Sequence, residues 1–321
     1  MKYFLGVDVG SSKTHALIAD ENGHKVGAGL SGPGNHQTVG YEGMYSALSQ
    51  SVNQALSDAS LTRNNISGSG FGISGFDWPS DKPRMLETIS RLDLPGPLDI
   101  HNDAILGLAA GAEGGWGIAV VSGTGCNCWG WDRERRHIGR VTGFGEITGE
   151  AAGSTELVFR AMQRVAYAWT RRGPETGLTQ GFIDHVGAED DGDLLEGYTT
   201  GRYQVDGSAA PLVFQVAERG DEVACELVKW AGSELGELAK AVIRQLDFQA
   251  LAFDVVLVGS MFESGPMLID PMKETIKEQA PGARLVKLDV PPVFGAVLLG
   301  MEAGGTRPGI EIRTRLRDTL D

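Results

Sequence analysis

Short apolar runs that end in small polar residues recur along this chain, and longer amphipathic stretches separate them. Residues 3–8, 15–20 and 25–29 show the short runs, with turn-forming residues between them, and they predict three strands. Residues 41–58 carry apolar side chains at helical spacing, which predicts a helix. Strands that are followed by helices are typical of an α/β domain.

The alternation of strands and helices continues to the end of the chain. Further strands are predicted at residues 71–73, 98–101, 117–121, 129–131, 255–258 and 284–288. Further helices are predicted at residues 83–92, 104–111, 155–169, 209–219, 222–246, 267–279 and 293–303. Residues 182–186 and 193–199 have no decisive pattern, and the mixed-charge tail, 306–321, is expected to be an exposed appendage.

One layout occurs twice: an apolar strand, a small polar turn and a returning strand. It is found at residues 3–20 and again at 117–131. The two turns share little sequence identity, so the repeat is one of pattern only. With 321 residues the chain is long enough for two domains, and no change of composition marks a linker. We therefore expect two similar halves, the first ending near residues 104–111.

The charge balance limits the partners that this chain can have. Asp and Glu number 42 and Lys and Arg 28, which gives a net charge of −14. Such a charge disfavours nucleic acid or an anionic membrane as the main partner. It leaves a nucleotide possible, because a few local donors and a metal ion overcome a diffuse negative field.

The cysteines and the beginning of the chain suggest a cytoplasmic protein. Three cysteines, Cys126, Cys128 and Cys225, suit a reducing compartment better than a disulfide framework. The first two have no second close pair, so neither a zinc site nor an iron–sulfur cluster is supported. Met1 leads directly into the first strand, so no signal peptide is expected, and no apolar run reaches the ~20 residues of a membrane span.

The first hairpin turn has the composition of an anion-binding loop. Small residues let backbone N–H groups approach an anion, Lys13 adds a positive charge, and Ser11, Ser12 and Thr14 add hydroxyl donors. Asp8 would repel a phosphate unless a Mg²⁺ ion, held through water, lay between them. The alternative is an ordinary polar turn with a solvated aspartate.

A second turn, Gly123-Thr124-Gly125, follows a buried strand and offers similar donors. Gly-Thr-Gly is common, so a purely structural turn is the alternative reading. Two such turns in one chain suit a phosphate chain that is held from two sides. A third strand end, at Gly259-Ser260, offers a flat surface for an adenine ring, because a side chain there would block it.

Asp103 is the candidate catalytic base. It follows a short strand and begins a helix, a position from which a carboxylate projects beyond the end of a strand. A kinase needs one carboxylate to orient and deprotonate the acceptor hydroxyl. The alternative is an N-cap that only satisfies backbone donors, and either Asn102 or Asp103 suits that role.

Six segments in this order resemble the N-acetylglucosamine kinase family, which belongs with the BadF/BadG-type ATPases in the sugar kinase, Hsp70 and actin superfamily. They are residues 8–14, 35–36, 74–75, 102–104, 122–128 and 256–260. The resemblance implies an α/β fold with two ribonuclease-H-like (actin-like ATPase) domains that flank an interdomain cleft. The domains would be 1–108 and the larger 109–292, with a helix at about 293–305 packing back on the first and 306–321 as a tail.

The resemblance also implies the site. Asp103 would be the catalytic base acting on a sugar 6-hydroxyl, and Asp8 would hold Mg²⁺ through water. The residues expected to bind ATP are Gly10, Ser11, Ser12, Lys13, Thr14, Gly123, Thr124, Gly125, Gly259 and Ser260. The residues expected to bind the sugar are Asn35, His36, Ser74, Gly75, Asp103, Thr124, Asn127, Phe144, Gly145 and Glu150. A homodimer is expected, since dimers are usual in that family.

The sequence departs from the family pattern mainly where the sugar is expected to bind. Phe144-Gly145 stands where the family has Trp-Gly, and Glu150 stands where it has Asp, in a segment that is one residue longer. The expected function is transfer of the γ-phosphate of ATP to an amino sugar, N-acetylglucosamine first. Glucosamine or N-acetylmuramic acid kinase, a BadF-type ATPase that activates a partner enzyme, and a non-catalytic binding protein are the alternatives.

Overall fold

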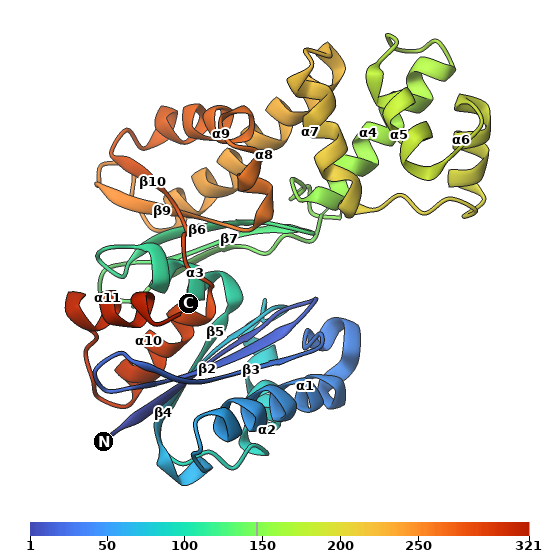
Figure 1. The fold of residues 1–321 in the computed structure, drawn as a ribbon. Helices are drawn as coiled ribbons and strands as arrows, with labels where there is room; N and C mark the ends of the chain where they lie inside the picture. Colours follow the sequence, from blue (N-terminus) through green and yellow to red (C-terminus); the bar gives the residue numbers. More distant parts are fainter. Residues whose placement is uncertain (146, 321) are drawn as a thin grey trace. The chain divides into compact units, whose positions relative to one another are not determined.

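The computed structural model describes residues 1–145 and 147–320. They form two compact units: Met1–Ala119 together with the chain from Val286 onward, and Val120–Leu285 (Figure 1). The division expected from the sequence lay at 108/109 and 292/293. Among the described residues, no helix has the length and apolar character needed to cross a membrane.

The sheet of the first unit mixes antiparallel and parallel strands. Its members are β1 (Tyr3–Val9), β2 (Thr14–Asp20), β3 (Lys25–Ser31), β4 (Ile66–Ile73) and β5 (Leu98–Asn102). They lie in the order β3-β2-β1-β4-β5, and β1, β4 and β5 are parallel. Val9 pairs with Ile73, and Ile73 pairs with Asn102. These three strands therefore end level with one another at the same edge of the sheet.

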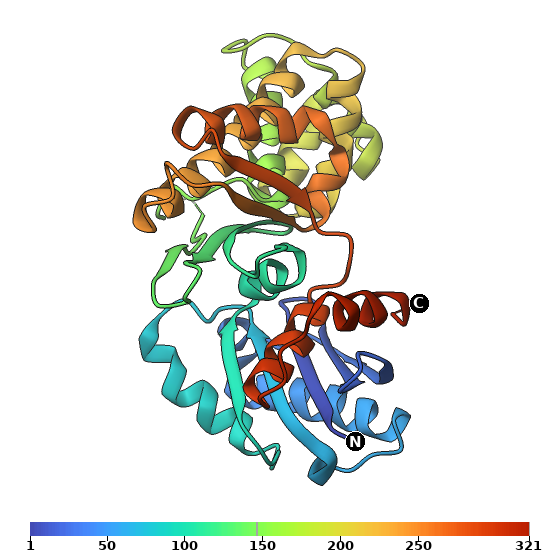
Figure 2. The same cartoon turned by 90° about the vertical axis from the view of Figure 1, so that its left-hand side faces the viewer.

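Helices cover both faces of this sheet (Figure 2). One face packs Leu5 and Val7 against α1 (His36–Asp58) and α2 (Lys82–Ser90). The other packs Phe4 and Leu17 against α10 (Val293–Ala303), next to α3 (Asp103–Gly111) and α11 (Ile310–Asp318). Two short 3₁₀ helices, η1 (Arg63–Asn65) and η2 (Pro79–Asp81), complete the unit.

Glycines in the sheet let α10 lie directly on the strands. A Cβ atom at Gly6 would collide with the backbone nitrogen of Val297, and one at Gly70 would collide with the carbonyl of Ala296. The helix is buried from Val293 to Met301. A helix that is apolar all round is expected when every face is covered by protein.

The second unit repeats the strand order of the first. Its strands are β6 (Gly117–Ser122), β7 (Cys126–Trp131), β8 (Ile138–Val141), β9 (Phe253–Val258) and β10 (Ala283–Lys287). They lie in the order β10-β9-β6-β7-β8, so in both sheets the first strand lies between the second and the fourth. This duplication is the α/β fold of ribonuclease-H-like (actin-like ATPase) type that the sequence predicts.

Several helices fill out the second unit. They are α4 (Ser154–Trp169), α5 (Gly177–Val186), α6 (Asp191–Thr199), η3 (Gly207–Ala209), α7 (Ala210–Glu218), α8 (Glu222–Gln245), η4 (Ser260–Ser264) and α9 (Pro266–Gln279). The long α8 packs between α9 and the strands β7 and β8. Helices α4 to α6 lie beyond α7 and away from this sheet (Figure 1).

Some element boundaries differ from those that the sequence predicts. Helix α1 begins at His36, not at residue 41, because the side chain of Asn35 accepts the N–H of Gln37 and caps it. Gly40, with φ of 68°, then kinks its first turns, which hides the helical pattern there. Residues 182–186 and 193–199 both belong to helices, α5 and α6, and β8 was not predicted.

The tail is not an exposed appendage, so that expectation was wrong. Its helix α11 buries Leu316 completely against the first unit. Arg313 donates through Nη2 to the carbonyls of Ala109, at 2.7 Å, and Ala110, at 3.1 Å. These carbonyls lie in the last turn of α3, so a cation satisfies acceptors that this helix end leaves open.

We predict that Arg313→Ala lowers the melting temperature by about 4 °C, because hydrogen bonds from a charged donor to buried carbonyls contribute about 2 kcal/mol. The matched control is Arg317→Ala on the same helix. Arg317 forms an exposed ion pair with Asp289 at 3.1 Å, and such pairs contribute little. Thermal unfolding followed by circular dichroism measures both variants. Equal melting temperatures for the two would contradict the capping role.

Candidate functional site

The loops that follow β1, β4 and β5 lie together at the edge where these strands end. Ser11 lies in the turn after β1, Ser74 directly follows β4, and Asp103 directly follows β5. Because the three strands end level, their following residues become neighbours, as is usual at the carboxyl ends of parallel strands. The Ser11 and Ser74 hydroxyl oxygens lie 3.1 Å apart.

The first hairpin turn presents some of its polar groups outward and hides others. Gly10 donates its N–H to the carbonyl of Lys13 at 2.9 Å, which closes the turn. Ser11, Ser12 and Lys13 are exposed and free to meet an anion. Thr14 is completely buried, and its hydroxyl has no partner among the described residues. Its side chain therefore belongs to the interior of the hairpin.

Asp103 occupies the first position of α3, and Asn102 is the N-cap. The Asn102 side chain accepts the N–H of Ala104 at 3.0 Å, and Asp103 Oδ1 also accepts it at 3.0 Å. Of the two residues that the sequence offers as caps, Asn102 is therefore the N-cap. The Asp103 carboxylate also accepts a hydrogen bond from the Ser74 side chain.

The carboxyl groups of Asp8 and Asp103 have unusual acidities. Both side chains are half-buried. Burial, and then the charge of Asp103, raise the pKa of Asp8 to about 7, and Lys13 opposes this. Burial, and then the charge of Asp77, raise the pKa of Asp103 to about 6, while hydrogen bonds from Ala104 and Ser74 oppose it. Perturbed carboxyl groups of this kind are typical of functional sites.

The sugar-site candidates of the first unit cluster around these carboxylates. Asn35 is buried and donates through Nδ2 to the Ser11 hydroxyl at 3.1 Å. Gly75, with φ of 83°, lies so close to Asn35 that a Cβ atom would be 2.5 Å from the side-chain oxygen Oδ1 of Asn35. His36 stacks on Tyr41, with 4.8 Å between ring centroids, and burial lowers its pKa.

The surroundings of Asp8 fit a Mg²⁺ ion. Its carboxylate is a hard oxygen donor, the kind of ligand that Mg²⁺ prefers. Burial and the neighbouring charge of Asp103 disfavour the ionised form of Asp8 and raise its pKa, and a cation beside the carboxylate would offset both effects. Among the described residues no group of three or more His, Cys, Asp or Glu side chains forms a protein metal cage. A Mg²⁺ ion that keeps water ligands needs no such cage.

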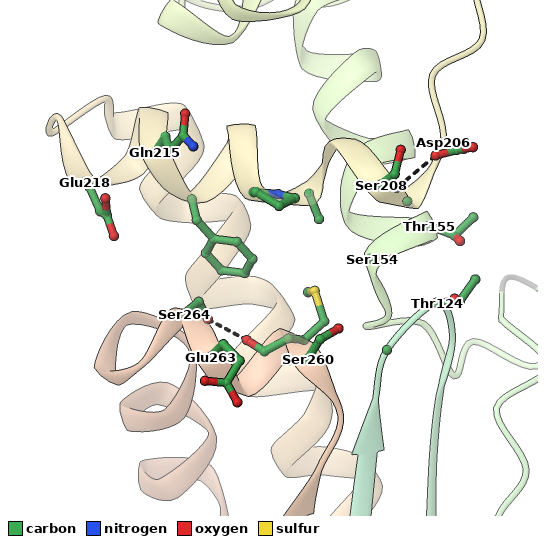
Figure 3. A pocket seen from close by; sticks show the side chains of 16 residues that line it. Thr124, Ser154, Thr155, Asp206, Ser208, Gln215, Glu218, Ser260, Glu263 and Ser264 are labelled. Atoms are coloured by element: carbon green, nitrogen blue, oxygen red, sulfur yellow. Dashed lines mark hydrogen bonds between the residues drawn. The ribbon is translucent and has the colours of Figure 1, made fainter. Parts of the chain in front are cut away.

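The second unit contains a cavity of about 670 Å³ (Figure 3). The cavity extends from Thr124, Ser154 and Thr155 at one end to Glu218 at the other. Phe214 and Met261 give it apolar walls. Among the described residues that line it there is no lysine or arginine, and the charged side chains are Asp206, Glu218 and Glu263. An apolar slot with a polar end suits a ring with a polar substituent.

The hydroxyl end of the cavity is built by the second turn and the beginning of α4. Ser154 donates its N–H to the Gly123 carbonyl at 2.8 Å, and Thr155 donates to the Thr124 carbonyl at 3.1 Å. These bonds hold the turn against the helix N-terminus, a place that favours anions. Of the residues that the sequence predicts to bind ATP, Gly123, Thr124 and Ser260 line this cavity, and Ser154 and Thr155 were not among those predicted.

A signal for the missed residues was present. Gly153 precedes Ser154-Thr155, and its N–H donates to the Glu156 carboxylate at 3.0 Å, as at the start of a capped helix. Asp206 likewise caps η3 by accepting the N–H of Ser208 at 2.9 Å. The sequence therefore indicates helix starts at Ser154 and Gly207, but it does not indicate that the two starts lie close together.

Gly259 is a glycine for a different reason from the one expected. Its φ is 112°, and a Cβ atom would collide with the carbonyl of Ser122. The place of its missing side chain is therefore filled by the backbone of β6. Neighbouring Ser260 and Met261 line the cavity instead.

The other sugar-site candidates of the second unit do not line this cavity. Glu150 Oε2 accepts the N–H groups of Gly143, at 2.6 Å, and Phe144, at 3.2 Å, so this oxygen organises its own loop. Gly145 forms a bridge with Glu150. Asn127 has a buried side-chain carbonyl oxygen with no partner among the described residues, which leaves it a free acceptor.

The cysteines do not suit an iron–sulfur cluster. Cys126 and Cys128 are buried. Burial raises the pKa of the Cys126 thiol to about 12 and that of the Cys128 thiol well above its usual range. Cys126 donates to the Glu150 carbonyl at 3.4 Å and accepts the Ala152 N–H at 3.2 Å. Protonated, buried thiols with internal partners are inert and structural.

We predict that Asp103→Asn stabilises the protein more at pH 8 than at pH 4.5. A raised pKa means that the native state binds this proton more tightly than the unfolded chain, so stability falls as the pH rises from about 4 to about 6. The neutral variant lacks this loss. Its gain in melting temperature over the wild type should be larger at pH 8 by about 2 °C. The same difference at both pH values would contradict the raised pKa.

Comparison with known proteins agrees with this geometry. The model of the BadF/BadG/BcrA/BcrD ATPase family matches residues 5–300. An N-acetyl-D-glucosamine kinase of Dictyostelium discoideum is 28% identical over 314 residues, covering 94% of this chain and 98% of that protein. An N-acetylmuramic acid/N-acetylglucosamine kinase of Clostridium acetobutylicum is 27% identical over 301 residues, covering 93% and 98%.

A solved structure shares the fold along its whole length. It is a Chromobacterium violaceum protein named provisionally as an N-acetylglucosamine kinase, with 25% identity and a TM-score of 0.72. The match covers 93% of this chain and 99% of that one. The chain therefore belongs to the BadF/BadG/BcrA/BcrD ATPase family, and the curated relatives that it resembles along its length are sugar kinases.

Proposed function

We propose that this chain transfers the γ-phosphate of ATP to a hydroxyl group of an amino sugar, the 6-hydroxyl of N-acetylglucosamine before others. The observation that carries the proposal is Asp103: a half-buried carboxylate with a raised pKa, level with the phosphate-type turn after β1. The two curated relatives act on N-acetylglucosamine, and one of them also acts on N-acetylmuramic acid.

Asp103 would orient the acceptor hydroxyl and take its proton as the phosphoryl group is transferred. With a pKa of about 6 it is ionised at neutral pH, yet it is a stronger base than an ordinary carboxylate. Asn35 and Ser74, which are linked through Ser11, would supply hydrogen bonds to sugar hydroxyls. Fixing the acceptor in this way supplies much of the rate in phosphoryl transfer.

Each unit has a turn that suits phosphate oxygens. The cavity of the second unit suits the nucleoside, with Phe214 and Met261 against the base, and its Thr124 end suits phosphate oxygens. Exposed Ser11, Ser12 and Lys13 of the first turn would also bind phosphate. A bound Mg²⁺ ion, held by Asp8 through water, would neutralise phosphate charge.

A group of three carboxylates favours an uncharged or cationic sugar over an anionic one. Asp8, Asp77 and Asp103 gather in the first unit, and Lys13 is the charge that opposes them at Asp8. A sugar carboxylate, as in N-acetylmuramic acid, would meet these like charges at a cost. We therefore place N-acetylglucosamine and glucosamine ahead of N-acetylmuramic acid.

We predict ATP-dependent ADP release with N-acetylglucosamine in a coupled assay, and weaker release with glucose or N-acetylmuramic acid. Asp103→Asn should lower kcat by about 10³-fold or more, because the base is removed while the fold is kept. The same variant should keep its affinity for ATP, which isothermal titration measures. Full activity of this variant would contradict the assigned role, and release that needs no sugar would point to an ATPase.

We predict an acidic limb in the pH profile of kcat/KM for the sugar, measured at saturating ATP and Mg²⁺. The base acts only when ionised, so kcat/KM should fall about tenfold for each pH unit below the pKa of Asp103, which is about 6. The reverse reaction, from sugar phosphate and ADP, provides the control, because there the protonated carboxyl is the competent form. A flat forward profile from pH 5 to pH 8 would contradict the assignment.

A further inference from the structure

Asp77 is a buried carboxylate whose hydrogen bonds connect it to the loops of the candidate site. It lies in the loop between β4 and η2 and is 5% exposed. Its Oδ2 accepts from Nε2 of Gln37 at 3.0 Å, and its Oδ1 accepts from Nδ2 of Asn102 at 3.3 Å. Burying a charge is costly unless it is well hydrogen-bonded, so both oxygens have found donors.

Other contacts fix the orientation of both amide partners. Gln37 Nε2 also donates to the Gly75 carbonyl at 3.4 Å. Asn102 Nδ2 donates to the Phe76 carbonyl at 3.3 Å, and Asn102 Oδ1 accepts the N–H of Ala104. Each amide thus turns its NH₂ group, not its oxygen, toward Asp77. Only a side chain with two acceptor oxygens satisfies both donors.

These bonds connect Asp77 to the candidate base from two directions. Asn102 caps the helix that Asp103 begins. Gln37 donates its backbone N–H to Asn35, whose amide reaches the Ser11–Ser74 pair, and Ser74 in turn hydrogen-bonds the Asp103 carboxylate. These contacts form a closed ring that joins the segments after β1, β4 and β5 to the start of α1. Its members are Asp103, Ser74, Ser11, Asn35, Gln37, Asp77 and Asn102.

We propose that Asp77 is the positioning residue of the catalytic base, holding the cap of α3 and the first turn of α1 so that Asp103, Ser74 and Asn35 meet the sugar together. This inference rests on the proposed function. The buried charge of Asp77 also favours the protonated form of Asp103, which strengthens it as a base. Displacing an acceptor by about 1 Å costs up to about 100-fold in rate.

The test compares Asp77→Asn with the wild type in the sugar-dependent ADP-release assay. The substituted side chain keeps its shape but turns an NH₂ group toward one of two donors. We expect kcat to fall about 10- to 100-fold, with KM for ATP unchanged within twofold. The control is Asp93→Asn, the same substitution at an exposed carboxylate in the turn after α2 of the same unit. It should keep kcat within twofold.

A second substitution separates positioning from general damage. Adding Gln37→Glu to Asp77→Asn restores a complementary donor and acceptor with their polarity exchanged, and we expect it to recover at least fivefold of the lost kcat. Gln37→Glu alone sets two carboxylates against each other and should lower kcat. If Asp77→Asn does not fold, Gln37→Met, which removes the donor and keeps the charge, should lower kcat without changing KM for ATP.

The inference is overturned if Asp77→Asn, or in its place Gln37→Met, keeps kcat within twofold of the wild type. It is also overturned if the double variant is no faster than Asp77→Asn. A wild-type protein that shows no sugar-dependent ADP release contradicts the proposed function, and the inference falls with it. An active wild type with an equally active Asp77→Asn variant contradicts the inference alone.

Discussion

Because Val9, Ile73 and Asn102 pair side by side, three loops begin at the same level of one sheet edge. This register brings Ser11, Ser74 and Asp103 together although they are far apart in the sequence. A slip of one residue in any of the strands would turn its side chains to the other face and move the following loop. Helix α10 packs directly on glycines of β1 and β4, on the face of the sheet opposite α1. This packing holds the register of the strands.

The same register gathers carboxylates, which is unfavourable for stability and useful for chemistry. The native protein holds Asp8 and Asp103 with pKa values near neutrality, so each is more costly to ionise than in an unfolded chain. At Asp103, hydrogen bonds from the Ala104 N–H and the Ser74 hydroxyl offset part of the cost. This electrostatic cost to stability is retained because the function needs it, as at other functional sites.

The fold could be predicted from the sequence to a large extent, since a repeated strand–turn–strand pattern and a buried helix at 293–303 follow from apolar spacing. Asp8, Asp103 and Thr124 stood out because they end or follow apolar strands. Other features depend on tertiary contacts that the local pattern does not contain. No local pattern distinguishes Asp77 from an ordinary loop residue. Arg313 donates to the carbonyls of Ala109 and Ala110, which lie about 200 positions away in the sequence.

Gly259 and Glu150 show how tertiary contacts add roles that the local pattern does not contain. The backbone of Ser122 fills the place of a side chain at Gly259, and the Glu150 carboxylate binds the N–H of Gly143.

The central claim is that phosphate passes from ATP to a sugar hydroxyl. NMR of the product made from ATP and N-acetylglucosamine tests it most directly. The account predicts a phosphate ester at the 6-position, seen as ³¹P coupling to the protons on carbon 6. Inorganic phosphate with unmodified sugar would contradict it.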